Sequence, residues 1–193
     1  MIRREEILEM FEVSGALLRG HYQLSSGLHS ARYLQCARVL EDPRRAERLG
    51  REIFSLMKEG QGFGAVLSPA LGGVIIGHEA ARAAGARFLF TERDAEGHAV
   101  LRRGFNLHAG ERILVVEDVV TTGGSTAEVI NLAHAGGAIV GAVAAIVDRS
   151  GGKVSFDAPF RALLELEVPA FPPDLCDLCL QGVPVEKPGS RKK

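Results

Sequence analysis

The chain has 193 residues, of which 46% are hydrophobic and 24% are charged, and its formal net charge at pH 7 is -1. This length suits one domain with a single core, and the balanced charge argues against a protein that binds nucleic acid by neutralising phosphates. No run of about 20 apolar residues occurs, so we expect no membrane-spanning helix. The odd set of Cys36, Cys176 and Cys179 indicates free thiols and a reducing cytoplasm.

The first predicted elements are a helix and a hairpin. Apolar residues spaced three and four apart indicate an amphipathic helix over residues 3–18. Residues 20–34 predict two short strands around a turn at Ser25, Ser26 and Gly27. Asp42 and Pro43 then suit the cap and the first turn of the next helix.

A loop of small residues follows the first buried strand. Residues 65–67 predict that strand, and residues 74–84 predict a helix after the loop. Ala70, Leu71 and Gly72 lie between them, where free backbone amides could hold a pyrophosphate. A plain turn that binds no anion is the alternative.

A long polar stretch comes after the next predicted strand, residues 87–90. Residues 91–103 are charged and interrupted by glycine, with a short strand expected over residues 99–102. A loop of this length in a compact domain is usually functional or disordered. Alternatively, its charges simply solvate a hairpin.

The most informative stretch joins a buried strand over residues 113–116 to a helix that includes residues 128–132. Glu117 and Asp118 end the strand, and residues 121–126 are threonine, glycine and serine. Such a loop presents backbone amides and the positive end of a helix dipole to a phosphate. The two carboxylates could accept hydrogen bonds from the vicinal hydroxyls of a ribose. The pattern matches neither a Walker loop nor a dinucleotide-binding motif, and an ordinary strand–helix turn is the alternative.

The last predicted core strand covers residues 139–147 and ends at Asp148 and Arg149. A guanidinium at this end of a sheet could bind a carboxylate side-on, although a surface ion pair with Asp148 is also possible. Residues 160–167 suit an edge strand. In the tail, Cys176 and Cys179 have the C-x-x-C spacing, which supplies only half of a structural zinc site. A site shared across a dimer axis is one possibility, and two ordinary free thiols are the other.

The order of these elements predicts an α/β fold: a parallel sheet flanked by helices, with a small N-terminal hood. We expect a single domain over residues 1–193. Within it, residues 1–40 supply the helix and hood hairpin, residues 60–167 the core, and residues 168–193 an irregular tail.

Nine consecutive residues resemble the phosphoribosyl-pyrophosphate (PRPP) motif of type I phosphoribosyltransferases. They are Glu117, Asp118, Val119, Val120, Thr121, Thr122, Gly123, Gly124 and Ser125. The resemblance implies the type I phosphoribosyltransferase fold and PRPP as a substrate. It also implies that the hydroxyl–glycine loop anchors the 5-phosphate and that the two acids hold the ribose.

The hairpin resembles the hood of the orotate-specific branch of that family, in which a Leu-x-Ser-Gly turn and a following tyrosine cover the pyrimidine. This likeness implies transfer of phosphoribosyl from PRPP to orotate, giving orotidine 5′-phosphate and pyrophosphate in pyrimidine biosynthesis. The implied orotate contacts are Thr121, Arg149, Ser25 and Tyr33.

The same resemblance assigns further roles. Ala70, Leu71 and Gly72 become the pyrophosphate loop, where many bacterial members carry a lysine at the position of Gly72. Arg93, His98 and Arg103 become contacts of a mobile lid that closes over the neighbouring site of a homodimer. Asp118, Arg93 and His98 are the implied catalytic residues. Mg²⁺ is expected to be held by PRPP and water rather than by a protein metal site.

Two other functions stay open at this point. The first is a phosphoribosyltransferase for a purine or another base, which would share the PRPP loop. The second is a PRPP-sensing regulator without catalysis, although the chain has no appended helix-turn-helix and no basic patch.

Overall fold

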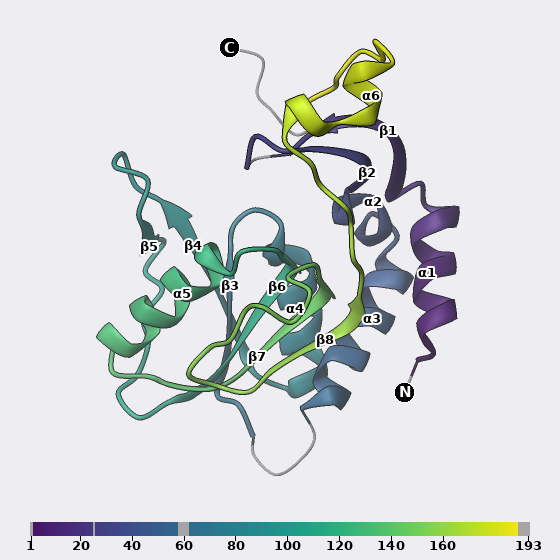
Figure 1. Ribbon diagram of the computed structural model, residues 1–193. Coiled ribbons are helices and arrows are strands. Elements are labelled where there is room, and N and C mark those ends of the chain that lie inside the picture. Colours follow the sequence, from purple (N-terminus) through teal and green to yellow (C-terminus); the bar gives the residue numbers. More distant parts are fainter. Residues whose placement is uncertain (1, 25, 58–61, 189–193) are drawn as a thin grey trace.

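The computed structural model describes residues 2–24, 26–57 and 62–188 (Figure 1). Ser25, one of the expected orotate contacts, lies outside the described residues. The elements in chain order are α1 (Arg4–Val13), β1 (Leu17–Gln23), β2 (His29–Leu34), α2 (Cys36–Leu40), α3 (Pro43–Leu56), β3 (Ala65–Pro69), α4 (Gly73–Ala84), β4 (Arg87–Arg93), β5 (Ala99–Leu101), β6 (Arg112–Val120), α5 (Gly124–Ala135), β7 (Ile139–Asp148), β8 (Phe160–Glu165), the 3-10 turn η1 (Pro173–Leu175) and α6 (Asp177–Leu180).

A six-stranded sheet in the order β5-β4-β3-β6-β7-β8 forms the centre of the molecule. Every neighbouring pair is parallel except β4 with β5. The prediction of a parallel sheet flanked by helices is therefore confirmed, and β8 takes the expected edge position. Within the described residues, no helix is long and apolar enough to cross a membrane.

The apolar residues of the central strands alternate between the two faces of the sheet. Val66, Leu114 and Val116 pack with α1, α2, α3 and α4 on one face. Leu67 and Val115 pack with α5 and residues 156–160 on the other. Strands covered on both faces read as continuous apolar runs, which is why residues 113–116 and 139–147 were recognisable in the sequence.

The first helix is shorter than its apolar spacing predicted. It ends at Val13, and residues 17 and 18 begin β1 instead. Gly15 adopts a φ of 63°, its N–H donates to the carbonyl of Glu12, and the N–H of Ala16 donates to the carbonyl of Phe11. This pair of bonds closes the last helical turn and redirects the chain, so the prediction of a helix to residue 18 was wrong.

Two further boundaries differ from expectation. Glu117 and Asp118 do not end β6, which continues to Val120 because β7 pairs with it along that length. Most of the predicted long loop is a β-hairpin, since β4 runs to Arg93 and pairs with β5. The N-cap of α3 is as predicted, because the Asp42 carboxylate accepts the N–H of Arg44 at 2.9 Å.

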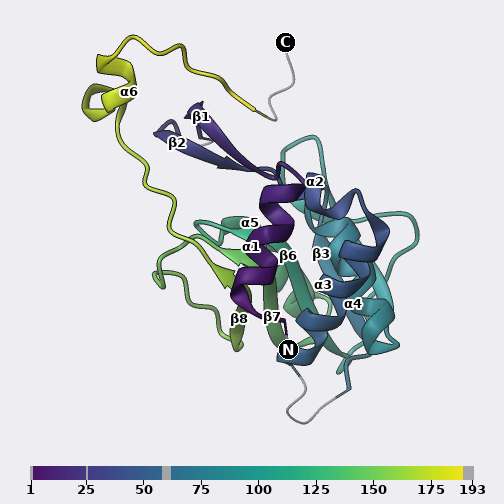
Figure 2. The same cartoon turned by 90° about the vertical axis from the view of Figure 1, so that its right-hand side faces the viewer.

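The hood consists of β1 and β2, an antiparallel pair at the end of the molecule where the parallel strands finish (Figures 1 and 2). After β8 the chain continues onward to this hood, and α6 lies above it (Figure 2). Backbone hydrogen bonds join His29 to Phe171 and link Gln23 and His21 to Glu186. The tail therefore contacts both edges of the hairpin.

Candidate active site

The ends of β6 and β7 bring two loops of the predicted site together. Val120 pairs with Asp148 in the sheet, and the N–H of Arg149 donates to the carbonyl of Val120 at 2.8 Å. The loop that starts at Thr121 therefore begins beside Arg149. The carboxyl ends of parallel strands are where open α/β sheets bind ligands.

The acid pair lies on the part of β6 that extends beyond its pairing with β3. The last β3 partner on β6 is Val115, so Glu117 and Asp118 face the loop that follows β3. The carboxylate of Glu117 accepts the N–H of Asp118 at 3.1 Å, and that of Asp118 accepts the N–H of Val119 at 2.8 Å. Both side chains are held in fixed positions by these bonds.

Burial governs the protonation of both acids. It raises the pKa of Glu117 well above the usual carboxyl range, and the negative charge of Asp118 raises this pKa further. Burial also raises the pKa of Asp118. Two adjacent buried carboxylates need hydroxyl donors or a cation when both are ionised. The hydroxyls of a sugar would meet this need.

A hollow of about 180 Å³ lies at the N-terminus of α5. Its lining comprises Glu117, Val119, Val120, Thr121, Thr122, Gly123, Gly124, Ser125 and Thr126. No side chain caps this helix, so the amides of its first turn are available to an anion. Gly123 has a φ of 76°, and a Cβ there would lie 2.8 Å from Val154, so the loop needs glycine at this position.

A second hollow, of about 430 Å³, adjoins the first and shares Val119, Thr121 and Thr122 with it. The other residues around it are Gln23, Leu24, Ser26, Tyr33, Leu34, Asp118, Arg149, Lys187 and Pro188. Hood, acid pair, phosphate loop and tail therefore meet around one space. Three of the four predicted orotate contacts line it: Thr121, Arg149 and Tyr33.

Arg149 is the side chain in this hollow that most clearly needs a ligand. Its Nε atom is buried and has no hydrogen-bond partner among the described residues. Burial lowers the pKa of its guanidinium. The carboxylate of Asp148 accepts the N–H of Ser150 at 2.7 Å, and no ion pair joins it to Arg149. A carboxylate ligand would satisfy both the charge and the open donor.

The loop of Ala70, Leu71 and Gly72 lies against the acid pair. The N–H of Ala70 donates to the carbonyl of Thr91, and Leu71 is exposed. A Cβ atom at Gly72 would lie 2.7 Å from both carboxylate oxygens of Asp118. With this backbone, a lysine at position 72 would collide with Asp118.

The three residues predicted for a lid lie outside the two hollows. Arg93 pairs with Glu128 of α5 and donates to the carbonyl of Gly97. His98 lies 3.5 Å from the carboxylate of Asp94, and its side chain is exposed. Arg103 pairs with Glu92 at 2.7 Å. None of these side chains lines either hollow, and Arg93 acts on the acid pair only through its charge, which opposes the rise in the pKa of Glu117.

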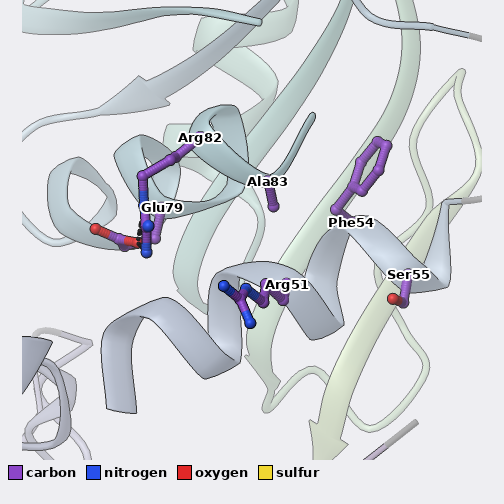
Figure 3. A pocket seen from close by; sticks show the side chains of 6 residues that line it. All are labelled: Arg51, Phe54, Ser55, Glu79, Arg82 and Ala83. Carbon is purple, nitrogen blue, oxygen red and sulfur yellow. Dashed lines mark hydrogen bonds and ion pairs between the residues drawn. The ribbon is translucent and has the colours of Figure 1, made fainter. Parts of the chain in front are cut away.

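A further hollow of about 450 Å³ lies between α3 and the C-terminal half of α4 (Figure 3). Arg51, Phe54, Ser55, Glu79, Arg82 and Ala83 line it. Its charged groups already pair with one another: Arg82 with Glu79 at 2.6 Å and with Glu47 at 3.2 Å, and Arg51 with Glu47 at 2.5 Å. The charges at this place are paired, whereas Nε of Arg149 in the larger hollow has no partner among the described residues.

Known proteins settle the family. An orotate phosphoribosyltransferase of Thermotoga maritima is 52% identical over 185 residues, covering 96% of this chain and 98% of the relative. One from Heliobacterium modesticaldum is 50% identical over 189 residues, covering 97% and 98%. The chain belongs to the orotate phosphoribosyltransferase family. No model in a scan of protein families matches it.

Solved structures of orotate phosphoribosyltransferases show the same fold. The crystal structure of the Aeropyrum pernix enzyme superposes with a TM-score of 0.69 at 27% identity, covering 83% of this chain and 93% of that one. The Mycobacterium tuberculosis enzyme in complex with PRPP gives a TM-score of 0.65 at 25% identity, covering 84% and 96%. The predicted type I phosphoribosyltransferase fold is confirmed.

Several residues at the site carry no signal in the sequence. Lys187 and Pro188 line the larger hollow, although the tail looks irregular and remote from the core. Gln23 reaches the same hollow from the hood. Only the return of the tail to the hood places Lys187 there, and local sequence patterns do not report such long-range packing.

Proposed function

We propose that this chain transfers the phosphoribosyl group of PRPP to orotate, giving orotidine 5′-phosphate and pyrophosphate, a reaction of pyrimidine biosynthesis. One observation carries the proposal: the uncapped N-terminus of α5, the buried acid pair and the unpartnered Nε of Arg149 meet around two adjoining hollows. Each of these groups matches one part of the two substrates. Family membership supports the same reaction.

The donor occupies the smaller hollow and the acid pair. Amides and hydroxyls of residues 121–125 hold the 5-phosphate at the positive end of α5. Glu117 and Asp118 accept hydrogen bonds from the ribose hydroxyls. Pyrophosphate lies along Ala70, Leu71 and Gly72, whose backbone continues into the N-terminus of α4.

The acceptor occupies the larger hollow. Arg149 binds the carboxylate of orotate, Tyr33 of the hood covers the ring, and Thr121 lies at the boundary with the donor. The bond from the anomeric carbon to pyrophosphate breaks while a ring nitrogen of orotate bonds to the same carbon from the opposite face. The protein contributes placement of both substrates and stabilisation of charge, and Asp118 is positioned to accept a proton.

The acid pair also suits Mg²⁺. The carboxylates of Glu117 and Asp118 are the hard oxygen ligands that this ion prefers, and their burial beside each other favours a cation nearby. Mg²⁺ bound mainly to PRPP and water would neutralise charge on the departing pyrophosphate.

We further propose a homodimer that works in the cytoplasm. The hairpin of β4 and β5 projects from the edge of the sheet (Figure 1). Arg93, His98 and Arg103 lie on or beside it and do not reach the hollows of their own chain. In a dimer these side chains would close over pyrophosphate in the neighbouring site and exclude water. The free thiols suit a reducing compartment.

The test is pyrophosphate release from PRPP in the presence of orotate, uracil, adenine or hypoxanthine, with Mg²⁺ supplied. We expect release with orotate and none with the purines. Release with a purine alone would overturn the assignment of the acceptor. PRPP binding without release for any base would indicate a regulator instead.

A further inference from the structure

Four metal-type ligands meet where the tail packs on the hood. They are His21 of β1, His29 of β2, and Cys176 and Cys179 of the tail. All four ligand atoms lie within 4.8 Å of one another. Among the residues that the structure describes, this is the one group of its kind, and it is separate from the two substrate hollows.

The fold explains how residues so far apart in sequence converge. His29 pairs with Gln23 in the hairpin, and His21 lies in the irregular part of β1 where the register shifts, with its ring centroid 4.9 Å from that of His29. Cys176 and Cys179 are three residues apart at the start of α6, so both thiols lie on one side of this turn. Backbone bonds between His29 and Phe171 fix the tail beside β2.

The distances between the four ligand atoms suit tetrahedral coordination of one metal ion. His21 Nε2 lies 2.9 Å from His29 Nδ1, 3.5 Å from Cys176 Sγ and 3.7 Å from Cys179 Sγ, while His29 Nδ1 lies 3.2 Å from Cys179 Sγ. With the bond lengths of a zinc site, tetrahedral ligand atoms are about 3.3–3.8 Å apart. Small movements of these side chains would therefore complete the geometry.

Hydrogen bonding alone does not account for the cluster. His21 Nδ1 lies 2.7 Å from the carbonyl oxygen of Val183, which can only accept, so this nitrogen carries the proton. In the neutral ring, Nε2 then offers one lone pair, yet three groups approach it. At most one of them can donate to it well. A metal ion would use the lone pairs of all four groups, and the bond to Val183 would orient the ring.

We propose that His21, His29, Cys176 and Cys179 bind one structural zinc ion within a single chain. Two thiolates and two imidazoles form a closed set of four ligands, which is typical of structural zinc and leaves no position for a substrate. The sequence alone supplied only the two cysteines and left a site between two chains or a pair of free thiols open. The structure supplies the missing histidines from the same chain.

The hood and tail need such a link because little apolar surface holds them. A two-stranded hairpin is only marginally stable in water unless it packs against other elements. The apolar side chains of the tail are largely exposed: Phe171, Leu175, Leu180, Val183 and Val185. Metal binding would supply the missing stability. It would also hold Lys187 in the larger hollow, a consequence that rests on the proposed function.

The first test is the metal content of the full chain purified without chelator. We expect one zinc ion per chain, and the visible spectrum of a tetrahedral cobalt–thiolate complex after exchange with Co²⁺. Cys179→Ser and His29→Ala should each lower zinc content at least about fivefold. Cys36→Ala and His108→Ala, which change a cysteine and a histidine outside the cluster, should leave it unchanged.

Other results would overturn the proposal. Less than about a tenth of an equivalent of zinc after growth with added zinc, with the partly exposed thiol of Cys179 reactive in the folded chain, would leave the cluster a hydrogen-bonded one. Full zinc content in both His21→Ala and His29→Ala would instead indicate four cysteines shared between two chains. None of these readouts depends on turnover, so they are independent of the proposed reaction.

Hydrogen exchange provides a second measurement. Removing zinc with a chelator should speed exchange of the amides of Phe171 and Glu186 at least about tenfold, because these amides hold the tail to the hood. Amides of the buried strand β7, such as that of Val143, should keep their rates. Unchanged exchange at Phe171 and Glu186 after complete zinc removal would contradict the stabilising role.

Discussion

Gly72 lies directly against Asp118: a Cβ atom on Gly72 would come within 2.7 Å of both carboxylate oxygens. The loop proposed for pyrophosphate and the acid proposed for the ribose therefore lie against each other in the absence of substrate. A side chain at position 72 has to displace the Asp118 carboxylate from its place on β6. This relationship couples the two halves of the donor site.

Gly72→Ala should therefore impair catalysis without unfolding the chain. We expect kcat/KM for PRPP to fall by about tenfold or more, because small displacements of a substrate-positioning group are costly. Steady-state kinetics with orotate would measure the loss. Gly62→Ala is the matched control, since nothing lies within 4 Å of its Cβ and its φ is unexceptional. Equal kinetics for both variants would show that Asp118 does not need its present position.

The two glycines of the phosphate loop should differ in their tolerance of a methyl group. Gly123 combines a φ of 76° with a contact to Val154, whereas a Cβ on Gly124 meets only Thr122 at 3.8 Å. Gly123→Ala should lower the free energy of unfolding by about 1–2 kcal/mol or more. Gly124→Ala should change it by less than about 0.5 kcal/mol. Denaturant titration of both variants checks this; the reverse order would mean that the loop has another conformation.

Glu117 should make stability depend on pH in a particular direction. Burial raises its pKa in the folded chain, so the folded state holds its proton more tightly than the unfolded state does. The free energy of unfolding should therefore fall as pH rises from about 4.5 through the raised pKa, and the loss should be complete above that value. The cost of ionising Glu117 in the folded, substrate-free protein is the cause of this loss.

Glu117→Gln should remove this dependence, because the amide can still accept the N–H of Asp118 but carries no charge. At pH 7 we expect the variant to be more stable than the natural chain, because it avoids the cost of ionising a buried carboxyl. Denaturant titrations at several pH values would measure it. Parallel pH profiles for the variant and the natural chain would contradict the assignment. PRPP affinity should fall in the same variant, since the ribose loses a charged acceptor.

Arg149 should decide between acceptor bases. In Arg149→Gln we expect transition-state stabilisation with orotate to fall by about 2–4 kcal/mol, the usual effect of leaving a buried charge unpaired. Any reaction with uracil, which lacks the carboxylate, should change little. Arg161→Gln, on the exposed side of β8, is the control. Equal losses with orotate and uracil would refute carboxylate recognition by Arg149.

Local patterns predicted the core of this protein well, because buried parallel strands and glycine loops have strong local signals. The stretch from Ile113 to Ser125 shows both, and its strand, loop and helix occur in the predicted order. Boundaries were less predictable. The end of the first helix depends on the backbone geometry of the Schellman turn at Gly15. The end of β6 at Val120 depends on its pairing with the neighbouring strand β7.

The hood and tail show what a local pattern cannot supply. Residues 168–188 contain little regular structure, and their placement depends on contacts with residues about 150 positions earlier. Lys187 therefore carried no signal, and Cys176 and Cys179 had only half of a ligand set until His21 and His29 were placed beside them. The lid residues remain predictions, because their role depends on a second subunit.

A crystal structure of this chain with PRPP, Mg²⁺ and an unreactive analogue of orotate tests the account most directly. The account predicts the 5-phosphate on the amides of residues 122–125, the ribose hydroxyls on Glu117 and Asp118, and the analogue's carboxylate on Arg149. A phosphate bound elsewhere, with the N-terminus of α5 left to water, would contradict it.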